Sequence, residues 1–597
     1  MDRTTVIGFV LIAIVLMVWI WMNSPTPQQQ KNVSNDSIST SQNNLDTLNK
    51  STSPPISSLQ TEQDSLGKYF SPLIAGQADI YKISTDVINA EISSRGGAIT
   101  SWELKKYSTW NGYTVNLINR DNTNNGDFNL LFYTSDGKLI NTKNLQFKPL
   151  SNINRTSNLS NKDSLSIDFA LSVSPKSKIL KSYTFYKDKY FVNVTYKFEE
   201  MDSIISNYEY QVVWETGLNY QERNSVDESS FAMAYSYAGG ELTEIDASSV
   251  GEPPVRENIS GLVKWVASRN KYFGIAILPQ GIESRGAYLE GVNHKLPDNG
   301  TKEYYHIGIK TPYLGRQSET SRFTLFLGPL DFDLVKSFNV DLDQIMSLGA
   351  VWIIRPISEF IMIPLFKFLH LFIPNYGIVI IIFSFIIKIT LHPLTKSSMT
   401  SMKKMQSLQP MIEEIKEKHK EDPQKMNMQV MRLYKEYGVN PAGGCLPMLL
   451  QMPILYALWS VFQSTIELRQ ASFVGWITDL SIPDVIAKLP IALPLFNITE
   501  VSGLSLLMGI TMFVQQKMTV KDPRQKMMIW LMPILMTLLF NSFPSGLNLY
   551  YFIFNLLSIG QQYWITKQHK DKPPQKVQPK KSGSLFSYLT KALPKLK

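Results

Sequence analysis

The feature that most constrains this chain is a series of long apolar runs in the last third of its 597 residues. A helix needs about 20 mostly apolar residues to cross a bilayer, and runs of this length and number are not expected in a plain soluble enzyme. The sequence therefore predicts an α-helical polytopic membrane protein with spans at about 376–394, 442–466, 501–516, 527–543 and 547–566.

A further apolar run lies near the start of the chain. Val6 to Met22 carries no charge, contains Trp19 and Trp21 near its end, and is not followed by a small-residue cleavage site. Because tryptophan favours the membrane interface, we predict that residues 1–23 form an uncleaved signal-anchor helix. Residues 24–66 are rich in Ser, Asn, Gln, Thr and Pro, and we expect them to be a disordered polar linker.

Residues 67–345 change to short alternating runs. In Tyr190 to Phe198, apolar and polar side chains alternate, which is the period-2 pattern of a half-buried strand. Similar runs recur between Gly, Asn and Pro residues, and together they predict a large all-β sandwich domain. The whole chain has one cysteine, Cys445, so a disulfide framework is excluded.

The distribution of charge predicts the orientation. The net charge is +9, and basic residues gather in segment 395–440 and in the tail, 567–597. Because basic segments stay on the cytoplasmic side, both chain ends are expected to be cytoplasmic and the β domain outside, with six spans in all. Residues 346–375 are apolar but interrupted by charges and prolines, so we expect an interfacial amphipathic helix there.

Lys388 is the one charged side chain well inside the five runs. An intramembrane charge is by default a functional group, although a lysine at this depth can also snorkel to the interface. Polar residues recur around it at helical spacing, and they favour a wet, lipid-facing groove over simple polar contacts between helices. The stripe in the last run consists of Asn548, Tyr551, Asn555, Ser558 and Gln562.

The sequence lacks the parts that several other functions need. No carboxylate lies deep in a span to pair with Lys388, which weakens an ion-coupled transporter. The histidines have no metal-ligand spacing, and no phosphate loop or nucleophile motif occurs. We therefore expect no catalytic residue, metal, cofactor or small-molecule substrate. A membrane-anchored, exported carbohydrate-binding protein remains an alternative, by analogy with other β-sandwiches.

The segment 395–440 is predicted to form a cytoplasmic helical hairpin. Apolar residues recur every three or four positions in two stretches, which an Asp-Pro pair separates. Because methionine adapts to varied apolar partners, Met402, Met405 and Met426 are candidates for binding apolar segments of partner proteins, here called clients. The alternative is that these residues only form the seam between the two helices.

Several short motifs resemble one known family. They are Pro393-Leu394-Thr395-Lys396, Asn440-Pro441-Ala442-Gly443-Gly444-Cys445-Leu446-Pro447, Gln451-Met452-Pro453 and Phe543-Pro544-Ser545-Gly546. These residues are similar to those of the YidC/Oxa1/Alb3 membrane protein insertases. The single anchor and the large exported domain resemble the long YidC form of Gram-negative bacteria.

The resemblance implies an insertase and folding chaperone of the bacterial inner membrane. Residues 376–566 would form a five-helix core whose hydrophilic groove opens to lipid and cytoplasm, with the large domain in the periplasm. The implied partners are nascent membrane proteins, the lipid bilayer, the Sec translocon and, through the basic tail, the ribosome. Lys388 stands where the family has an arginine, and Ser542 where some members have a substrate-contacting tryptophan. Positions that match the groove lining are Ser384, Gln451, Met508 and Tyr551.

Overall fold

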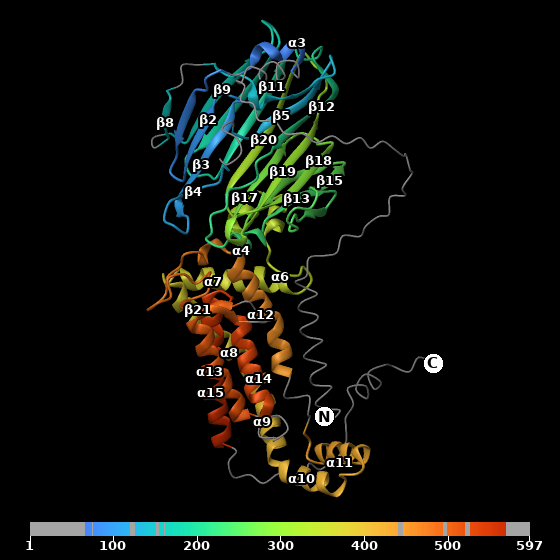
Figure 1. Cartoon of the computed structure of the whole chain (residues 1–597), viewed down its shortest axis with the longest axis vertical. Coiled ribbons are helices and arrows are strands. Elements are labelled where there is room, and N and C mark those ends of the chain that lie inside the picture. Colours follow the sequence, from blue (N-terminus) through green and yellow to red (C-terminus); the bar gives the residue numbers. More distant parts are fainter. Residues whose placement is uncertain are drawn as a thin grey trace, which may run out of the picture. The chain divides into compact units, whose positions relative to one another are not determined.

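We describe a computed structural model of the chain (Figure 1). The structure describes residues 66–568, apart from residue 75 and the segments 120–125, 151–153, 160–161, 440–445, 494–497 and 520–525. The predicted signal anchor (1–23) lies outside these residues, as do nearly all of the predicted linker (24–66) and basic tail (567–597).

Three sheets make up the β domain, and the largest has nine strands in the order β14-β13-β16-β17-β20-β11-β10-β9-β7. All of its neighbouring strands pair in an antiparallel manner. Its strands are β7 (Lys148–Pro149), β9 (Ser164–Ser172), β10 (Lys178–Tyr186), β11 (Phe191–Glu199), β13 (Met233–Ala238), β14 (Glu241–Ile245), β16 (Val263–Arg269), β17 (Phe273–Gln280) and β20 (Ser318–Pro329).

Two smaller sheets complete the domain. The six-stranded sheet, in the order β15-β18-β19-β12-β5-β6, consists of β5 (Asn129–Thr134), β6 (Leu139–Asn141), β12 (Ile205–Trp214), β15 (Val255–Ser260), β18 (Gly286–Lys295) and β19 (Thr301–Pro312). The five-stranded sheet, in the order β4-β3-β2-β1-β8, consists of β1 (Ile80–Ser84), β2 (Ile88–Ser93), β3 (Ala98–Ser108), β4 (Thr114–Asn116) and β8 (Thr156–Asn158). Short helical turns connect them: α3 (Gly67–Phe70), η1 (Ser71–Leu73), η2 (Thr142–Asn144), α4 (Ser225–Ser229) and η3 (Pro297–Asn299).

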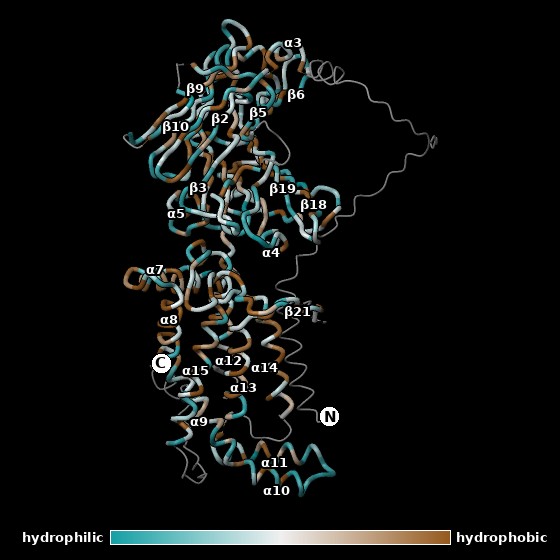
Figure 2. Tube along the Cα trace, turned by 60° about the vertical axis from the view of Figure 1, so that its left-hand side comes forward, coloured by the Kyte–Doolittle hydropathy of each residue, from teal (hydrophilic) through white to brown (hydrophobic). Residues whose placement is uncertain are grey.

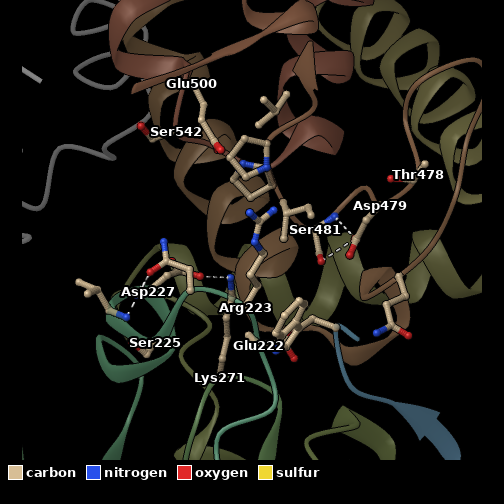
Figure 3. Close-up of a pocket in the computed structure, with 18 of the residues that line it drawn as sticks. Glu222, Arg223, Ser225, Asp227, Lys271, Thr478, Asp479, Ser481, Glu500 and Ser542 are labelled. Atoms are coloured by element: carbon tan, nitrogen blue, oxygen red, sulfur yellow. Dashed lines mark hydrogen bonds and ion pairs between the residues drawn. The ribbon is translucent and has the colours of Figure 1, made fainter. Parts of the chain in front are cut away.

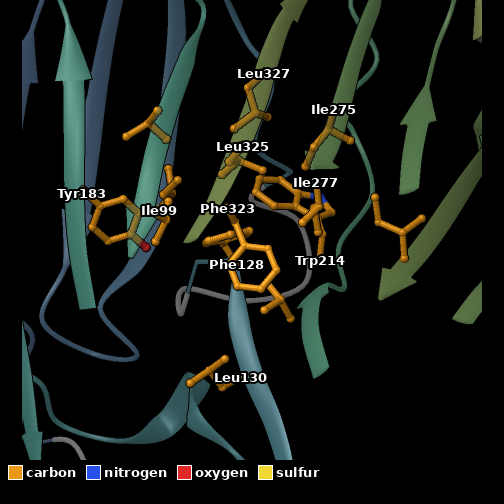
Figure 4. Close-up of a cluster of buried hydrophobic side chains, with 14 of the residues drawn as sticks. Ile99, Phe128, Leu130, Tyr183, Trp214, Ile275, Ile277, Phe323, Leu325 and Leu327 are labelled. Carbon is orange, nitrogen blue, oxygen red and sulfur yellow. The ribbon is translucent and has the colours of Figure 1, made fainter. Parts of the chain in front are cut away.

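The core of the domain lies between facing sheets (Figure 4). In β11, buried and half-buried residues alternate along all nine positions, as the period-2 pattern predicted. The ring of Phe198 on β11 lies 4.9 Å from that of Tyr210 on β12, centroid to centroid. Trp102 on β3 donates from its indole nitrogen to the backbone oxygen of Leu327 on β20, at 2.9 Å. The predicted β-sandwich is therefore confirmed.

A short helical segment joins the β domain to the apolar helices. It contains α5 (Phe332–Lys336), η4 (Leu342–Ile345), α6 (Ile354–Ile357), the π-helical turn η5 (Ser358–Met362) and α7 (Ile363–His370). Arg355 binds Asp343 at 2.8 Å, and Lys367 binds Asp333 at 2.6 Å. These ion pairs join α6 to η4 and α7 to α5 within the segment. Phe360, Phe368 and Phe372 remain exposed on the same segment, so it has the apolar face that the predicted interfacial helix needs.

Each of the five predicted runs contains one helix. They are α8 (Tyr376–Thr390), α12 (Leu446–Ser464), α13 (Gly503–Thr519), α14 (Lys526–Phe540) and α15 (Ser545–Gln568). Among the described residues, no helix taken alone has both the length and the hydropathy of a membrane span. The helix α8 together with Thr395–Ser407 has both, as a pair bent by 65°.

Two further elements flank these helices. On one side, α9 (His392–Ser407), α10 (Gln409–Lys418) and α11 (Pro423–Glu436) form the predicted hairpin, and the side chain of Asp422 caps α11 by accepting from the Lys425 amide. On the other side, the segment between α12 and α13 contains η7 (Ile466–Leu468) and the hairpin of β21 (Val485–Leu493) and β22 (Ile498–Ser502).

Lys181 is a cation buried inside the sandwich. Its Nζ donates to the backbone oxygen of Phe128 at 2.6 Å and lies 5.2 Å from the centroid of the Tyr183 ring. Burial lowers the pKa of Lys181 well below its usual value, and the nearby Asp127 carboxylate opposes this only in part.

The lowered pKa predicts a pH-dependent stability. Since the folded chain holds the Lys181 proton less tightly than the unfolded chain, the unfolding free energy should rise as pH increases from the folded pKa towards about 10.5. Lys181→Met should remove this slope. Urea unfolding of the full chain in detergent, followed by the β signal in circular dichroism, measures it. An unchanged slope in the variant would contradict the assignment.

Candidate functional site

Lys388 lies in the last turn of α8 and faces α15. Its side chain is 7% exposed, and its Nζ donates to the hydroxyl oxygen of Ser558 at 2.6 Å. The same ammonium lies 4.5 Å from the centroid of the Phe554 ring, a cation–π contact. Ser558 in turn donates to the backbone oxygen of Phe554 at 2.8 Å. Lys388 is therefore solvated by two residues one turn apart on a neighbouring helix.

Other polar contacts join the helices near Lys388. The amide nitrogen of Gln561 lies 3.1 Å from both the His392 ring and the Thr395 hydroxyl, so α15 also contacts the start of α9. Asn555 on α15 donates to the Thr511 hydroxyl on α13 at 3.5 Å. Three helices, α8, α13 and α15, therefore meet around one polar stripe.

The other predicted groove residues lie on the same bundle. Ser384 is fully buried and donates to the backbone oxygen of Ile380 at 2.8 Å. Met508 and Asn548 are buried, whereas Gln451 on α12 and Tyr551 are half-buried. Within the described residues, no hydrogen bond joins Gln451 to Lys388 or its neighbours. Lys388 and Asn555 therefore lie where α8, α13 and α15 meet, whereas Gln451 lies on α12, outside this group.

Several buried polar atoms in the bundle have no partner within the described part of the chain. They are the side-chain oxygens of Asn548 and Tyr550 and the indole nitrogen of Trp459. A buried polar group without a partner costs about 1–3 kcal/mol, and bound water normally removes this cost. Polar atoms of this kind favour a hydrated interior over one that is sealed by contacts between helices.

The hairpin methionines occupy different environments. Met426 is buried, and Met405 packs against the small apolar cluster of Leu408, Ile412, Tyr437 and Val439. Met402 is half-buried on α9. Met405 thus contributes to the seam of the hairpin, and Met426 is shielded from solvent. The exposed methionines are Met428 and Met431, at 62% and 48%.

A cavity of about 1120 Å³ lies between the β domain and the chain segments that connect the apolar helices. Its lining carries both signs of charge (Figure 3): Glu222, Asp227, Asp479, Glu500, Arg223 and Lys271. Lys271 binds Asp227 at 2.7 Å. Ser542 lines this cavity, and so lies outside the stripe around Lys388. Such a cavity suits a polar, charged chain segment better than an apolar one.

Arg469 binds Glu222 of the β domain, one of the residues that line the cavity. The contact measures 2.6 Å, and the two side chains are 2% and 13% exposed. Arg469 also donates to the backbone oxygen of Ser108 at 2.7 Å. Burial raises the pKa of the adjacent Glu228 to about 8, with Glu222 adding to the effect. Sequence reasoning found no role for Arg469, although it is one of two basic residues in segment 467–500.

Removal of one partner of this ion pair should be costly. Glu222→Ala leaves the Arg469 charge buried and uncompensated, which we expect to reduce the unfolding free energy by on the order of 3 kcal/mol. Adding Arg469→Leu should restore part of the loss. A double-mutant cycle by urea unfolding of the full chain measures the coupling, and strictly additive losses would contradict it.

Ser558 is expected to position the Lys388 ammonium. Ser558→Ala removes the hydroxyl acceptor and should lower the stability of the helical core by about 1–3 kcal/mol, whereas Ser558→Thr keeps the hydroxyl and should lose less. Thermal unfolding of both purified variants in detergent is the measurement. Equal losses would show that packing, not the hydrogen bond, matters at this position.

Two family profiles together cover most of the chain. The profile described as 60Kd inner membrane protein matches residues 368–572, and the profile described as YidC periplasmic domain matches residues 80–362. Among curated proteins, the chain is 39% identical over 590 residues to a membrane protein insertase YidC of Chlorobaculum parvum, which covers 98% of each chain. It is 37% identical over 596 residues to the membrane protein insertase YidC of Chlorobium luteolum, which covers 98% of this chain and 100% of that one.

A solved structure is similar over most of the same range. It is an active YidC insertase with its first transmembrane domain resolved, and the match has 19% sequence identity and a TM-score of 0.34. The match covers 85% of this chain and 98% of that chain.

Proposed function

The chain belongs to the YidC family of membrane protein insertases, and we propose that it inserts clients through a polar groove centred on Lys388. It is an inner membrane protein with a periplasmic β-sandwich domain, and it acts on membrane proteins in the lipid bilayer. The observation that carries the proposal is the buried Lys388, which binds Ser558 and has no ion-pair partner among the described residues.

The proposed topology has six spans. Helices α8, α12, α13, α14 and α15 form the five-helix core, and residues 1–23 supply the sixth span. Both chain ends and the hairpin α9–α11 are cytoplasmic, as the basic residues in 395–440 and 567–597 favour. The chain between α12 and α13 then lies on the periplasmic side with the β domain, in keeping with the Arg469–Glu222 contact.

The groove lowers the barrier for polar flanks of a client. A nascent apolar segment brings polar residues, and each unpaired polar group that enters hydrocarbon costs several kcal/mol. Polar side chains along α13 and α15, together with the water bound to them, would form hydrogen bonds with the polar flank for part of its path across the membrane. Lys388 attracts acidic residues in the flank because its ammonium lacks a carboxylate partner among the described residues. The hydrophobicity of the segment then drives its release sideways into lipid.

Lysine replaces the arginine of the family and changes the recognition. An ammonium is a compact point charge with three donors, whereas guanidinium is a planar fork that binds a carboxylate through two parallel hydrogen bonds. One Lys388 donor already binds Ser558. We therefore propose that Lys388 attracts acidic flanks by charge and does not select one carboxylate geometry.

The cytoplasmic elements are proposed to receive the client. Met402, with the exposed Met428 and Met431 of α11, offers adaptable apolar contacts, while Met405 packs in the seam of the hairpin. The basic tail 567–597 is proposed to bind ribosomal RNA through contacts that weaken as salt rises. The insertase acts alone or beside the Sec translocon.

Charge at Lys388 should decide insertion activity. In a host depleted of the native protein, Lys388→Arg should complement, whereas Lys388→Ala and Lys388→Glu should reduce insertion of a single-span client with an acidic flank, Glu by tenfold or more, about 1.4 kcal/mol. Protease accessibility of the client's translocated flank gives the readout. Lys404→Ala, at an exposed cytoplasmic lysine, is the matched control.

The levels of all variants must be equal, as checked by immunoblotting of membranes. Normal insertion by Lys388→Ala would mean that the charge of Lys388 has no part in insertion, and the groove proposal would then be wrong.

A further inference from the structure

The hairpin of β21 and β22 exposes an unusual amount of apolar surface. Ile486 and Ile491 on β21 are 51% and 79% exposed. Val474 and Trp476, in the loop before the hairpin, are 65% and 51% exposed. We name these four residues the hairpin patch.

A hairpin of two strands with this much apolar surface is not expected to be stable when water covers it. An isolated two-stranded hairpin is marginally stable at best, and stable examples pack against another layer. The exposed ion pair of Lys488 with Glu500, at 3.6 Å, joins the strands but contributes little. Most described residues of β21 are exposed, so the hairpin projects from the rest of the protein. A layer other than water is therefore expected to cover the hairpin patch.

The base of the hairpin is fixed to the start of α13. Asp484 accepts from the Trp476 indole nitrogen at 2.9 Å, from the Ser502 hydroxyl at 2.5 Å and from the Leu504 amide at 2.7 Å. Trp476 and Ile486 both approach Gly503 closely. If Gly503 carried a Cβ atom, an atom of each of these two side chains would lie 3.0 Å from it. The hairpin patch thus begins where α13 begins.

The same segment is tied to the start of α15. The amides of Ser545 and Gly546 donate to the backbone oxygens of Ile482 and Leu480, at 2.8 and 2.9 Å. The hairpin therefore sits at the level where two helices of the core start. In the proposed topology this level is the outer surface of the membrane.

We propose that the hairpin patch is buried in the headgroup region of the outer leaflet, with lipid as its partner. Tryptophan favours this region, and aliphatic side chains beside it can reach the boundary between headgroups and acyl chains. The headgroups and their water can also satisfy the unpaired strand edges, which the hydrocarbon core cannot. This inference rests on the proposed topology.

The exposed aromatic residues of the segment η5–α7 would enter the same leaflet at another position. Phe360 and Phe368 are 70% and 56% exposed, and Lys367 ties α7 to Glu467, just after α12, at 3.5 Å. Figure 2 shows α7 and β21 near the same end of the helices and on different sides of them. Two apolar elements would then hold the outer end of the core in the lipid surface.

Fluorescence quenching in vesicles tests this inference. The full chain with Cys445→Ser and one new cysteine carries an environment-sensitive dye at position 491, in vesicles of phosphatidylethanolamine and phosphatidylglycerol. Lipids with a spin label near the headgroup should quench Ile491→Cys as strongly as Phe368→Cys on α7. The matched control is Leu262→Cys, a residue of the β domain that is 57% exposed, which should not be quenched.

A further label separates the inference from the topology on which it rests. Ile510→Cys lies on α13 and is 60% exposed, so spin-labelled lipids should quench it if α13 spans the membrane. Quenching at position 510 without quenching at 491 overturns the hairpin inference alone, whereas no quenching at either position overturns the topology as well. If the dye at 491 is shielded from aqueous iodide but not quenched by lipid, protein covers the patch and the lipid inference is wrong.

Discussion

The helical core is organised around one buried cation. An ammonium that leaves water for an apolar bundle loses its hydration, so neighbouring helices must solvate Lys388, which is buried in the last turn of α8. Ser558 supplies an acceptor and Phe554 a ring face, and both come from α15, which fixes α8 against α15. The polar residues on α13 and α15 extend this environment along the bundle, and we propose that they form the path that the insertase offers to a client.

The outer end of the core is held by a second set of charges. Arg469 reaches from the segment after α12 to Glu222 of the β domain, while Arg355 and Lys367 bind Asp343 and Asp333 in the helical segment that follows this domain. A continuous apolar cluster, which includes side chains from β16 and from α8, accompanies these ion pairs. The periplasmic domain is therefore attached to the core through specific buried contacts, and the hairpin of β21 and β22 lies at the same end.

Some of this arrangement could be predicted from the sequence. Period-2 alternation identified the sandwich, and a charge in an apolar run identified Lys388, because both signals are local. Helical spacing also placed Ser558 on the stripe that faces Lys388. The partnership of Phe554 gives no sequence signal, since an apolar residue in an apolar run is the norm.

Long-range pairings could not be predicted. The parallel pairing of β1 with β8, and the contact of Arg469 with Glu222, join segments far apart in the chain. Such features depend on tertiary packing.

A charge exchange between insertase and client tests whether residue 388 attracts the client's flank electrostatically. Insertion of one single-span client, with either Asp or Lys at a fixed position of its translocated flank, is measured with the native protein and with Lys388→Glu. We expect that the native protein inserts the Asp client better and that Lys388→Glu reverses this order. The same order with both proteins would contradict electrostatic attraction of the flank by residue 388.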